Sequence, residues 1–326
     1  MAQIKKPFQT PLWILRRNES DIINCYNFMT PYILRATGGT MLNFGYWNGK
    51  TVSLVQAQNE LCMLVGKFAQ LHSAKNVLDV GSGFSAPAIY WKSIYSTLDI
   101  TCLNVNLVQL KTAADLVRGA DSSNILNSKK THQALSFIDH NTATDVELLN
   151  GTAKILPLTD ECVDRIIALE SAQHFKPLIE FIQESRRILR HDNGLLVVAI
   201  PVITTAKSSI STKIHDFMQL GILSLTWASE HYELEFVKLL ITRSGFDIID
   251  IQHIGSHVYE PLADYYAQNR EKIKSIILKE RTSSYLQSIL YNVIERVVFN
   301  SAVKMKEASQ KGFIDYVLIK AKCRTS

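Results

Sequence analysis

Apolar residues recur along the chain with two different spacings. Residues 54–71 repeat them every three to four positions, which predicts a helix with one buried face. Residues 76–80, NVLDV, form a short apolar run typical of a buried strand, and a glycine turn, GSG, follows at 81–83. From there strand-like and helix-like segments alternate as far as residue 319, which predicts a series of strand–helix–strand units.

This alternation predicts an α/β fold with a doubly wound, Rossmann-like sheet of about seven strands. The expected strands are residues 76–80, 98–105, 146–149, 165–169, 195–200, 246–251 and 313–319, and the expected helices are 54–71, 86–95, 107–117, 178–189 and 233–242. The last strand alternates apolar and polar residues more than the others do, which favours an edge or an antiparallel position.

The chain has no linker rich in Pro, Gly or Ser, so we expect a single domain, residues 1–326. Two helical cap segments should fold over the carboxyl edge of the sheet, where open α/β folds bind ligands. The expected parts are a sheet core (about 70–200, 231–255 and 312–322), an N-terminal helical lid (1–70), a polar surface insertion (119–143) and the cap segments (202–230 and 257–310).

Composition excludes several classes of protein. Hydrophobic residues make up 47% of the 326 and the net charge is only +5, so the chain can bury a sizeable core and disorder is excluded. The basic residues form no dense stripe, which argues against a nucleic-acid partner. No apolar stretch approaches the roughly 20 residues of a membrane span. Five scattered cysteines without CxxC spacing indicate a reducing, cytoplasmic location, and no cluster of potential ligands predicts a metal site.

The glycine turn is the strongest local signal for a ligand. With Ala86 it satisfies the dinucleotide pattern G-x-G-x-x-A, in which the glycines let a ligand approach the backbone. Asp79 lies directly before the turn, however, where its charge would repel a pyrophosphate and attract a cation. The acidic residue expected after the second strand is also missing, because Asp99 lies at that strand's start. A nicotinamide-dependent oxidoreductase is therefore the disfavoured alternative.

Further motifs follow in a characteristic order. They are NFGYW at 43–47, LNVNLVQ at 103–109, NGTAKILPL at 150–158, VDRI at 163–166, ALESAQHF at 168–175 and RILRHDNG at 187–194. Together with the glycine turn, this set resembles the class I S-adenosylmethionine-dependent methyltransferases. It is most similar there to small-molecule O-methyltransferases such as the rebeccamycin sugar methyltransferase, with kinship to the tocopherol and sterol methyltransferases. The resemblance covers about residues 43–200 and returns at 244–246 and the last strand.

The resemblance implies positions for the methionine end of S-adenosylmethionine. Gly81 and Gly83 would pass under the methionine part, and Asp79 would lie near its ammonium group, directly or through water. Tyr46 would close over the same end of the cofactor. A surface aromatic without a role in binding is the alternative interpretation of Tyr46.

The ribose and adenine positions depart from the family pattern. Asn104, Asn106 and Gln109 offer amides near the ribose in place of the usual carboxylate, although the similar subfamily also uses small polar residues and a glutamine there. At the adenine the family has Gly-Asp-Ala, whereas Thr152 and Ala153 follow the glycine here. A threonine hydroxyl can accept a hydrogen bond from the adenine amino group, but less strongly than a carboxylate.

Two candidate residues follow the fourth strand, where the methyl group should point. The resemblance makes His174 a candidate general base, because a histidine pKa of about 6.5 suits proton transfer near neutral pH. A buried histidine that only holds a loop is the alternative. Gln173 replaces the first of two histidines common in the subfamily, and Pro201 stands where similar enzymes have an aspartate. We interpret Glu170 as a cofactor-side or structural residue.

Together these residues predict methyl transfer from S-adenosylmethionine to a small, largely apolar organic acceptor of secondary metabolism, most readily at oxygen. N- or C-methylation of a small molecule is one alternative. A methyltransferase-like binding protein without catalysis is another, suggested by the replacements at Thr152 and Gln173. The cap segments are expected to select the acceptor, whose identity the sequence does not specify.

Overall fold

The computed structural model describes residues 18–118, 146–204, 232–278 and 285–324. The predicted insertion at 119–143, most of the first cap segment and the first 17 residues of the lid lie outside the described residues. Among the helices of the described part, none is both long and apolar enough to cross a membrane.

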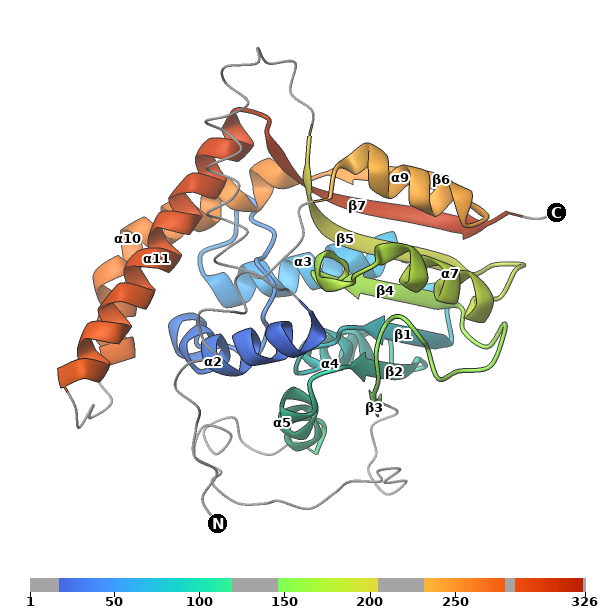
Figure 1. The fold of residues 1–326 in the computed structure, drawn as a ribbon, viewed down its shortest axis with the longest axis horizontal. Helices are drawn as coiled ribbons and strands as arrows, with labels where there is room; N and C mark the ends of the chain where they lie inside the picture. Colours follow the sequence, from blue (N-terminus) through green and yellow to red (C-terminus); the bar gives the residue numbers. More distant parts are fainter. Residues whose placement is uncertain (1–17, 119–145, 205–231, 279–284, 325–326) are drawn as a thin grey trace.

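The centre of the molecule is a seven-stranded sheet with the order β3-β2-β1-β4-β5-β7-β6 (Figure 1). Its strands are β1 (Asn76–Val80), β2 (Asp99–Asn104), β3 (Val146–Asn150), β4 (Arg165–Leu169), β5 (Leu195–Ile203), β6 (Phe246–His253) and β7 (Ile314–Cys323). β1 to β5 run parallel, whereas β7 is antiparallel to both of its neighbours. The predicted Rossmann-like fold and the antiparallel last strand are confirmed. β7 lies inside the sheet, and β6 forms the edge.

Helices connect the strands and extend beyond one end of the sheet. They are α2 (Glu19–Thr37), α3 (Leu54–Phe68), α4 (Ala86–Ile94), α5 (Leu107–Val117), α7 (Leu178–Ile188), α9 (Leu234–Arg243), α10 (Tyr259–Leu278) and α11 (Tyr285–Gln310). Short 3-10 turns follow α3, β4 and β6, at Leu71–Ser73, Ala172–His174 and Gly255–His257. The helices predicted at 54–71, 86–95, 107–117, 178–189 and 233–242 are all present, with ends shifted by three residues at most.

Two hydrophobic clusters cover the two faces of the sheet, because successive side chains of a strand point to opposite sides. Val77 packs into the cluster with α3 and α4, and Leu78 packs into the cluster with α7 and α9. In the first cluster the fully buried Trp91 donates its indole N–H to the carbonyl oxygen of Cys62, 2.7 Å away. In the second, Phe181 is fully buried. This packing fixes the strand ends that carry the candidate site.

α10 and α11 pack against each other as a long antiparallel pair at one end of the sheet (Figure 1). α2 contacts α10 and passes the same end of the sheet. The second predicted cap segment, 257–310, is helical apart from the residues that the structure leaves undescribed. These three helices face the carboxyl ends of the parallel strands, so the ends of the strands and the helices enclose a space between them.

Candidate active site

The glycine turn after β1 adopts a backbone conformation that other residues rarely take. Gly81 has a φ of +75° and Gly83 a φ of +58°. A Cβ atom on Gly81 would lie 2.4 Å from the Cβ of Ser171, so this glycine is required for packing. A Cβ on Gly83 would meet only Leu42 Cδ1, at 3.5 Å. The missing side chain of Gly83 therefore keeps space open beside the turn.

That space belongs to a cavity of about 160 Å³ at the carboxyl edge of the sheet, which we call the main cavity. The glycine turn, the ends of β2 and β4, and residues of α2, α10 and α11 line it. Seven of the predicted site residues line the main cavity: Gly81, Gly83, Asn104, Asn106, Gln109, Glu170 and His174. Asp79, Tyr46, Thr152 and Ala153 do not line it, and all eleven assignments remain predictions.

An amide network follows β2. The Asn104 side-chain Nδ2 donates to the Gly83 carbonyl and to Gln109 Oε1, both at 2.9 Å. Asn106 Nδ2 donates to Asn27 Oδ1 of α2, also at 2.9 Å. The buried Nε2 of Gln109 has no hydrogen-bond partner. Because a buried donor without a partner is costly, this group is available to a ligand in the main cavity.

Asp79 is a buried carboxyl group beneath the glycine turn. Only 2% of the residue is exposed, and its Oδ2 has no hydrogen-bond partner. Burial raises the pKa of Asp79 to about 7, because removal from water disfavours the charged form. A cationic group close to the turn would stabilise the carboxylate and reverse that shift.

The side chain of Glu170 forms hydrogen bonds to two other parts of the fold. Its two carboxylate oxygens accept from the Phe44 N–H at 2.9 and 3.0 Å, and the Tyr316 hydroxyl donates to Oε1 at 2.9 Å. Burial raises its pKa to about 8, partly offset by these hydrogen bonds. The side chain thus joins the end of β4 to β7 and to the segment before α3. The partners Phe44 and Tyr316 lie 126 and 146 residues away, so no sequence pattern indicated them.

His174 follows β4 in the 3-10 turn Ala172–His174 and lines the main cavity. Its Nε2 lies 2.8 Å from the hydroxyl oxygen of Tyr26, and the two rings meet edge to face with centroids 5.4 Å apart. Burial raises the pKa of Tyr26, so this hydroxyl keeps its proton. Tyr26 could not be identified from the sequence, because nothing in the pattern of residues 19–37 shows which strand end the helix approaches.

Thr152 lies after β3 and contacts α2. Its hydroxyl donates a short hydrogen bond to Oε1 of Glu19, and Lys154 Nζ lies 3.3 Å from the same oxygen. A carboxylate therefore lies next to Thr152 even though the family's aspartate is absent there. Glu19 precedes Thr152 by 133 positions, so no local sequence pattern connects the two residues.

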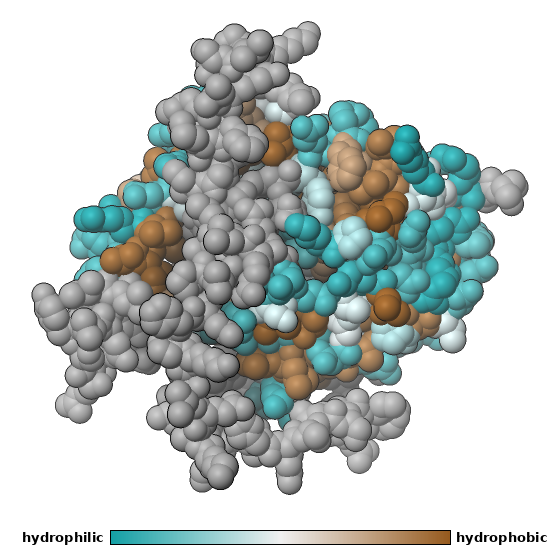
Figure 2. All heavy atoms as spheres, in the orientation of Figure 1, coloured by the Kyte–Doolittle hydropathy of each residue, from teal (hydrophilic) through white to brown (hydrophobic). Residues whose placement is uncertain are grey.

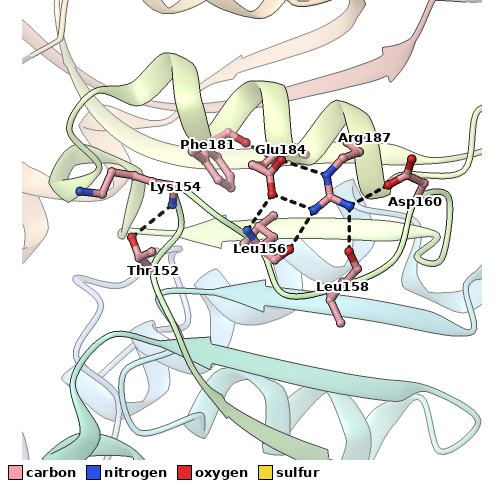
Figure 3. Close-up of polar contacts among 9 residues, drawn as sticks. Thr152, Lys154, Leu156, Leu158, Asp160, Phe181, Glu184 and Arg187 are labelled. Carbon is pink, nitrogen blue, oxygen red and sulfur yellow. Dashed lines mark hydrogen bonds and ion pairs between the residues drawn. The ribbon is translucent and has the colours of Figure 1, made fainter.

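The loop from Thr152 to Asp160 is held by one arginine of α7 (Figure 3). Arg187 donates to the carbonyl oxygens of Leu156 and Leu158, each at 2.8 Å, and to Asp160 Oδ1 at 2.8 Å. Glu184 accepts from Arg187 at 2.7 and 2.9 Å, and from the Leu156 N–H at 2.7 Å. These bonds fix the loop that carries Thr152 and Ala153 against the second cluster.

Tyr46 packs behind the main cavity. Its ring lies beside that of His257, with centroids 5.0 Å apart, and its N–H donates to the carbonyl of Ala57 at 2.8 Å. The residue is half-buried against the first cluster. Within the described residues, no group of three or more His, Cys, Asp or Glu side chains has the arrangement of a metal site.

Comparison with known proteins gives three consistent findings. Residues 78–198 match a family described as a methyltransferase domain. The chain is similar to erythromycin 3''-O-methyltransferase of Saccharopolyspora erythraea, with 23% identity over 71% of this chain and 69% of that protein. It is also similar to methyltransferase GfsG of Streptomyces halstedii, with 25% identity over 68% and 72%.

A solved structure extends the likeness to the fold. The cyclopropane synthase MmaA2 of Mycobacterium tuberculosis superposes with a TM-score of 0.69 at 16% identity, over 93% of this chain and 98% of that one. At that identity the likeness shows the fold alone.

Proposed function

We propose that this chain is an S-adenosylmethionine-dependent methyltransferase of small-molecule secondary metabolism, as its methyltransferase domain and its relatives support. We propose further that it methylates an oxygen of a small, largely apolar acceptor. The observation that carries this proposal is the main cavity. It brings the glycine turn and the amide network together with His174 beside apolar helices. The name of the relative from Saccharopolyspora erythraea, an O-methyltransferase, supports oxygen as the acceptor atom.

The residues of this chain fit the cofactor. Gly83 leaves open space beside the turn, the buried Asp79 has an oxygen without a partner for an ammonium group, and Gln109 has an unused N–H for a ribose hydroxyl. The residues 81–83 of the glycine turn, together with Asn104, would form the surface against which the cofactor lies. When bound, S-adenosylmethionine supplies a methyl group made electrophilic by its sulfonium.

The helices α2 and α11 supply apolar side chains that exclude water from the site. Ile22, Ile33 and Met305 are among the apolar residues that line the main cavity from α2 and α11. Methyl transfer from a sulfonium disperses the positive charge over the reacting atoms, and it neutralises charge when the nucleophile is an anion, so a site that excludes water favours it. Positioning the acceptor oxygen in line with the methyl group would supply much of the acceleration.

His174 is proposed as the general base. An alcohol loses its proton as the carbon–oxygen bond forms, and the imidazole at the end of β4 faces the same cavity. In the tautomer in which the Nε2–H donates to the Tyr26 hydroxyl, Tyr26 orients the ring and Nδ1 would take the proton of the alcohol. His174→Ala should lower kcat on an aliphatic alcohol by roughly a hundredfold to ten-thousandfold, with little change in cofactor affinity.

The test uses probes that share one chain and differ in the nucleophile: 1-decanol, decylamine and decanoic acid. Carbon-13-labelled S-adenosylmethionine reports by NMR whether the transferred methyl group is bonded to oxygen, nitrogen or carbon. We expect a methyl ether from 1-decanol, with a rate that rises with pH through the range where histidines titrate. That rise should disappear in His174→Ala.

Three outcomes would contradict the proposal. Retention of more than about a third of kcat in His174→Ala on the alcohol would refute the assignment of the base, because a lost general base costs far more. Methylation of decylamine alone would favour the N-methyltransferase alternative. Cofactor binding without turnover of any probe would favour the non-catalytic alternative.

A further inference from the structure

A second cavity, of about 110 Å³, lies between α2, α10 and α11. We call it the side chamber. Its walls are almost entirely apolar, and each of the three helices contributes to them. Residues that line it include Met29 and Ile33 of α2, Leu262 and Ile273 of α10, and Val298 and Ala302 of α11.

The side chamber adjoins the main cavity. Five residues line both spaces: Ile33, Leu42, Asn43, Phe44 and Met305. Leu42 also lies 3.5 Å from the position of a Cβ on Gly83, so the shared wall reaches the glycine turn. A molecule whose reactive end lies in the main cavity would have to pass this shared wall to reach the side chamber.

One polar side chain lies at the boundary between the two spaces. Asn43 is only 7% exposed, and neither its Oδ1 nor its Nδ2 has a hydrogen-bond partner. Gln58, which also lines the side chamber, donates from Nε2 to the carbonyl oxygens of Met41 and Asn43, and its Oε1 has no partner. Buried amides without partners are rare and costly, so these atoms indicate a ligand group that is polar at this point.

The charged residue of the side chamber is already neutralised. Glu295 is 4% exposed and forms an ion pair with Arg270, at 2.8 Å, and the guanidinium of Arg270 lies 3.8 Å from the centre of the Phe299 ring. A buried carboxylate paired in this way does not need a cationic ligand. The chamber therefore suits an uncharged occupant.

We propose that the side chamber binds an uncharged hydrocarbon part of the methyl acceptor, and that Asn43 hydrogen-bonds a hydroxyl or carbonyl oxygen on the acceptor skeleton as it passes between the two spaces. This rests on the proposed function, because it assigns the reactive end of the acceptor to the main cavity. The acceptor class is an extended, mostly apolar molecule with at least one oxygen besides the one that is methylated.

The volume of the side chamber limits the size of the hydrocarbon part that it can bind. An apolar cavity of about 150 Å³ holds one benzene molecule, so the side chamber at about 110 Å³ accommodates a few carbon atoms or part of a ring. Each methylene that enters it should strengthen binding by about fourfold, as hydrophobic transfer predicts.

The first test measures binding of 1-butanol, 1-hexanol, 1-octanol and 1-decanol by calorimetry with S-adenosylhomocysteine present. In the unmodified protein the affinity should rise steeply along the series. Ala302→Phe and Val298→Phe fill the side chamber and should stop the rise at a shorter chain. Affinity for S-adenosylhomocysteine should stay within about twofold, since neither residue lines the main cavity.

The matched control is Val297→Phe, on the same helix. Val297 is 45% exposed and lines neither cavity. Figure 2 shows exposed hydrophobic atoms at the left of the molecule, the side on which α10 and α11 lie in Figure 1. This control should bind the whole series like the unmodified protein. If both chamber-filling variants bound 1-decanol as tightly as the control, the side chamber would not be part of the acceptor site.

The second test concerns Asn43. Asn43→Leu should weaken binding of at least one of 1,4-, 1,5- and 1,6-decanediol by about tenfold, while 1-decanol binds as before or more tightly. Equal effects on all three diols and on 1-decanol would refute the hydrogen bond. Both tests measure binding, so they can succeed or fail independently of whether methyl transfer to oxygen occurs.

Discussion

The two walls of the main cavity are built in opposite ways. The wall at the sheet edge consists of turns after β1, β2 and β4, and its amides are held by bonds such as that of Asn104 to Gly83 at 2.9 Å. The wall formed by α2, α10 and α11 is apolar, and the amide of Asn43 at its edge has no partner. The first wall is polar and keeps unpaired groups at Gln109 and, beneath the glycine turn, at Asp79, whereas the second is apolar with one unpaired amide at its edge.

The difference separates the two tasks of the site. Hydrogen bonds are directional, so a wall of fixed amides and glycines suits one invariant ligand such as the cofactor. Hydrophobic contact is non-directional, so a wall of helices can be reshaped for another acceptor by exchanging a few side chains. Substitutions at the turns after β1 and β2 should therefore affect cofactor binding, and substitutions of apolar residues in the helices should affect the acceptor.

The largest effect is expected at Gly83. Gly83→Val places a branched side chain in the main cavity and should weaken S-adenosylmethionine binding by roughly a hundredfold or more, because the side chain would obstruct the ligand. Calorimetry measures the change. Gly312→Val is the control: Gly312 has a similar φ of +69° with nothing within 4 Å, so it carries the backbone strain without the obstruction. Near-normal binding by Gly83→Val would place the cofactor elsewhere.

A smaller, pH-dependent effect is expected at Asp79, whose pKa is raised to about 7. Below that pH the carboxyl is neutral and must lose its proton before it can attract an ammonium group. As the pH is raised toward 7, S-adenosylmethionine affinity should therefore increase by up to about tenfold per pH unit, and it should level off above pH 7. Asp79→Asn should bind more weakly at pH 8 and lose this dependence. An unchanged pH profile in the variant would mean that another group titrates.

A modest effect is expected where α2 meets the sheet edge. Tyr26→Phe removes the hydroxyl 2.8 Å from His174 Nε2 and should lower kcat by about fivefold, the value of one hydrogen bond. As a positioning residue, Tyr26 should also shift the pH at which the rate changes, with cofactor affinity unaltered. If kcat fell while the pH profile stayed in place, the contact would be structural only.

The smallest effect is expected at Thr152. Thr152→Asp alone should change cofactor affinity little, because the new carboxylate would lie beside that of Glu19. The combination with Glu19→Gln relieves this repulsion and should tighten S-adenosylmethionine binding by about fivefold if the new carboxylate accepts from the adenine amino group. Equal affinities of the single and double variants would argue against an adenine site at this position.

The sheet and the glycine turn could be predicted from the sequence because their signals are local. β1, β4, and the helix after β2 were expected at the positions where they occur. A strand needs only a short apolar run, and a turn with positive φ needs glycine, so a few adjacent residues suffice. For the same reason, the sequence predicts that Asn104, Asn106 and Gln109 lie close together, because they fall within six residues at the end of one strand.

The tertiary structure alone decided which partners these residues meet. Glu170 bonds with Phe44 and Tyr316, His174 with Tyr26, and Thr152 with Glu19, each across more than 120 residues of sequence. The side chamber is likewise formed by three helices whose periodicity shows an apolar face but not what that face encloses. Packing against distant elements sets the rotation and placement of a helix, and a single sequence carries no local signal for that choice.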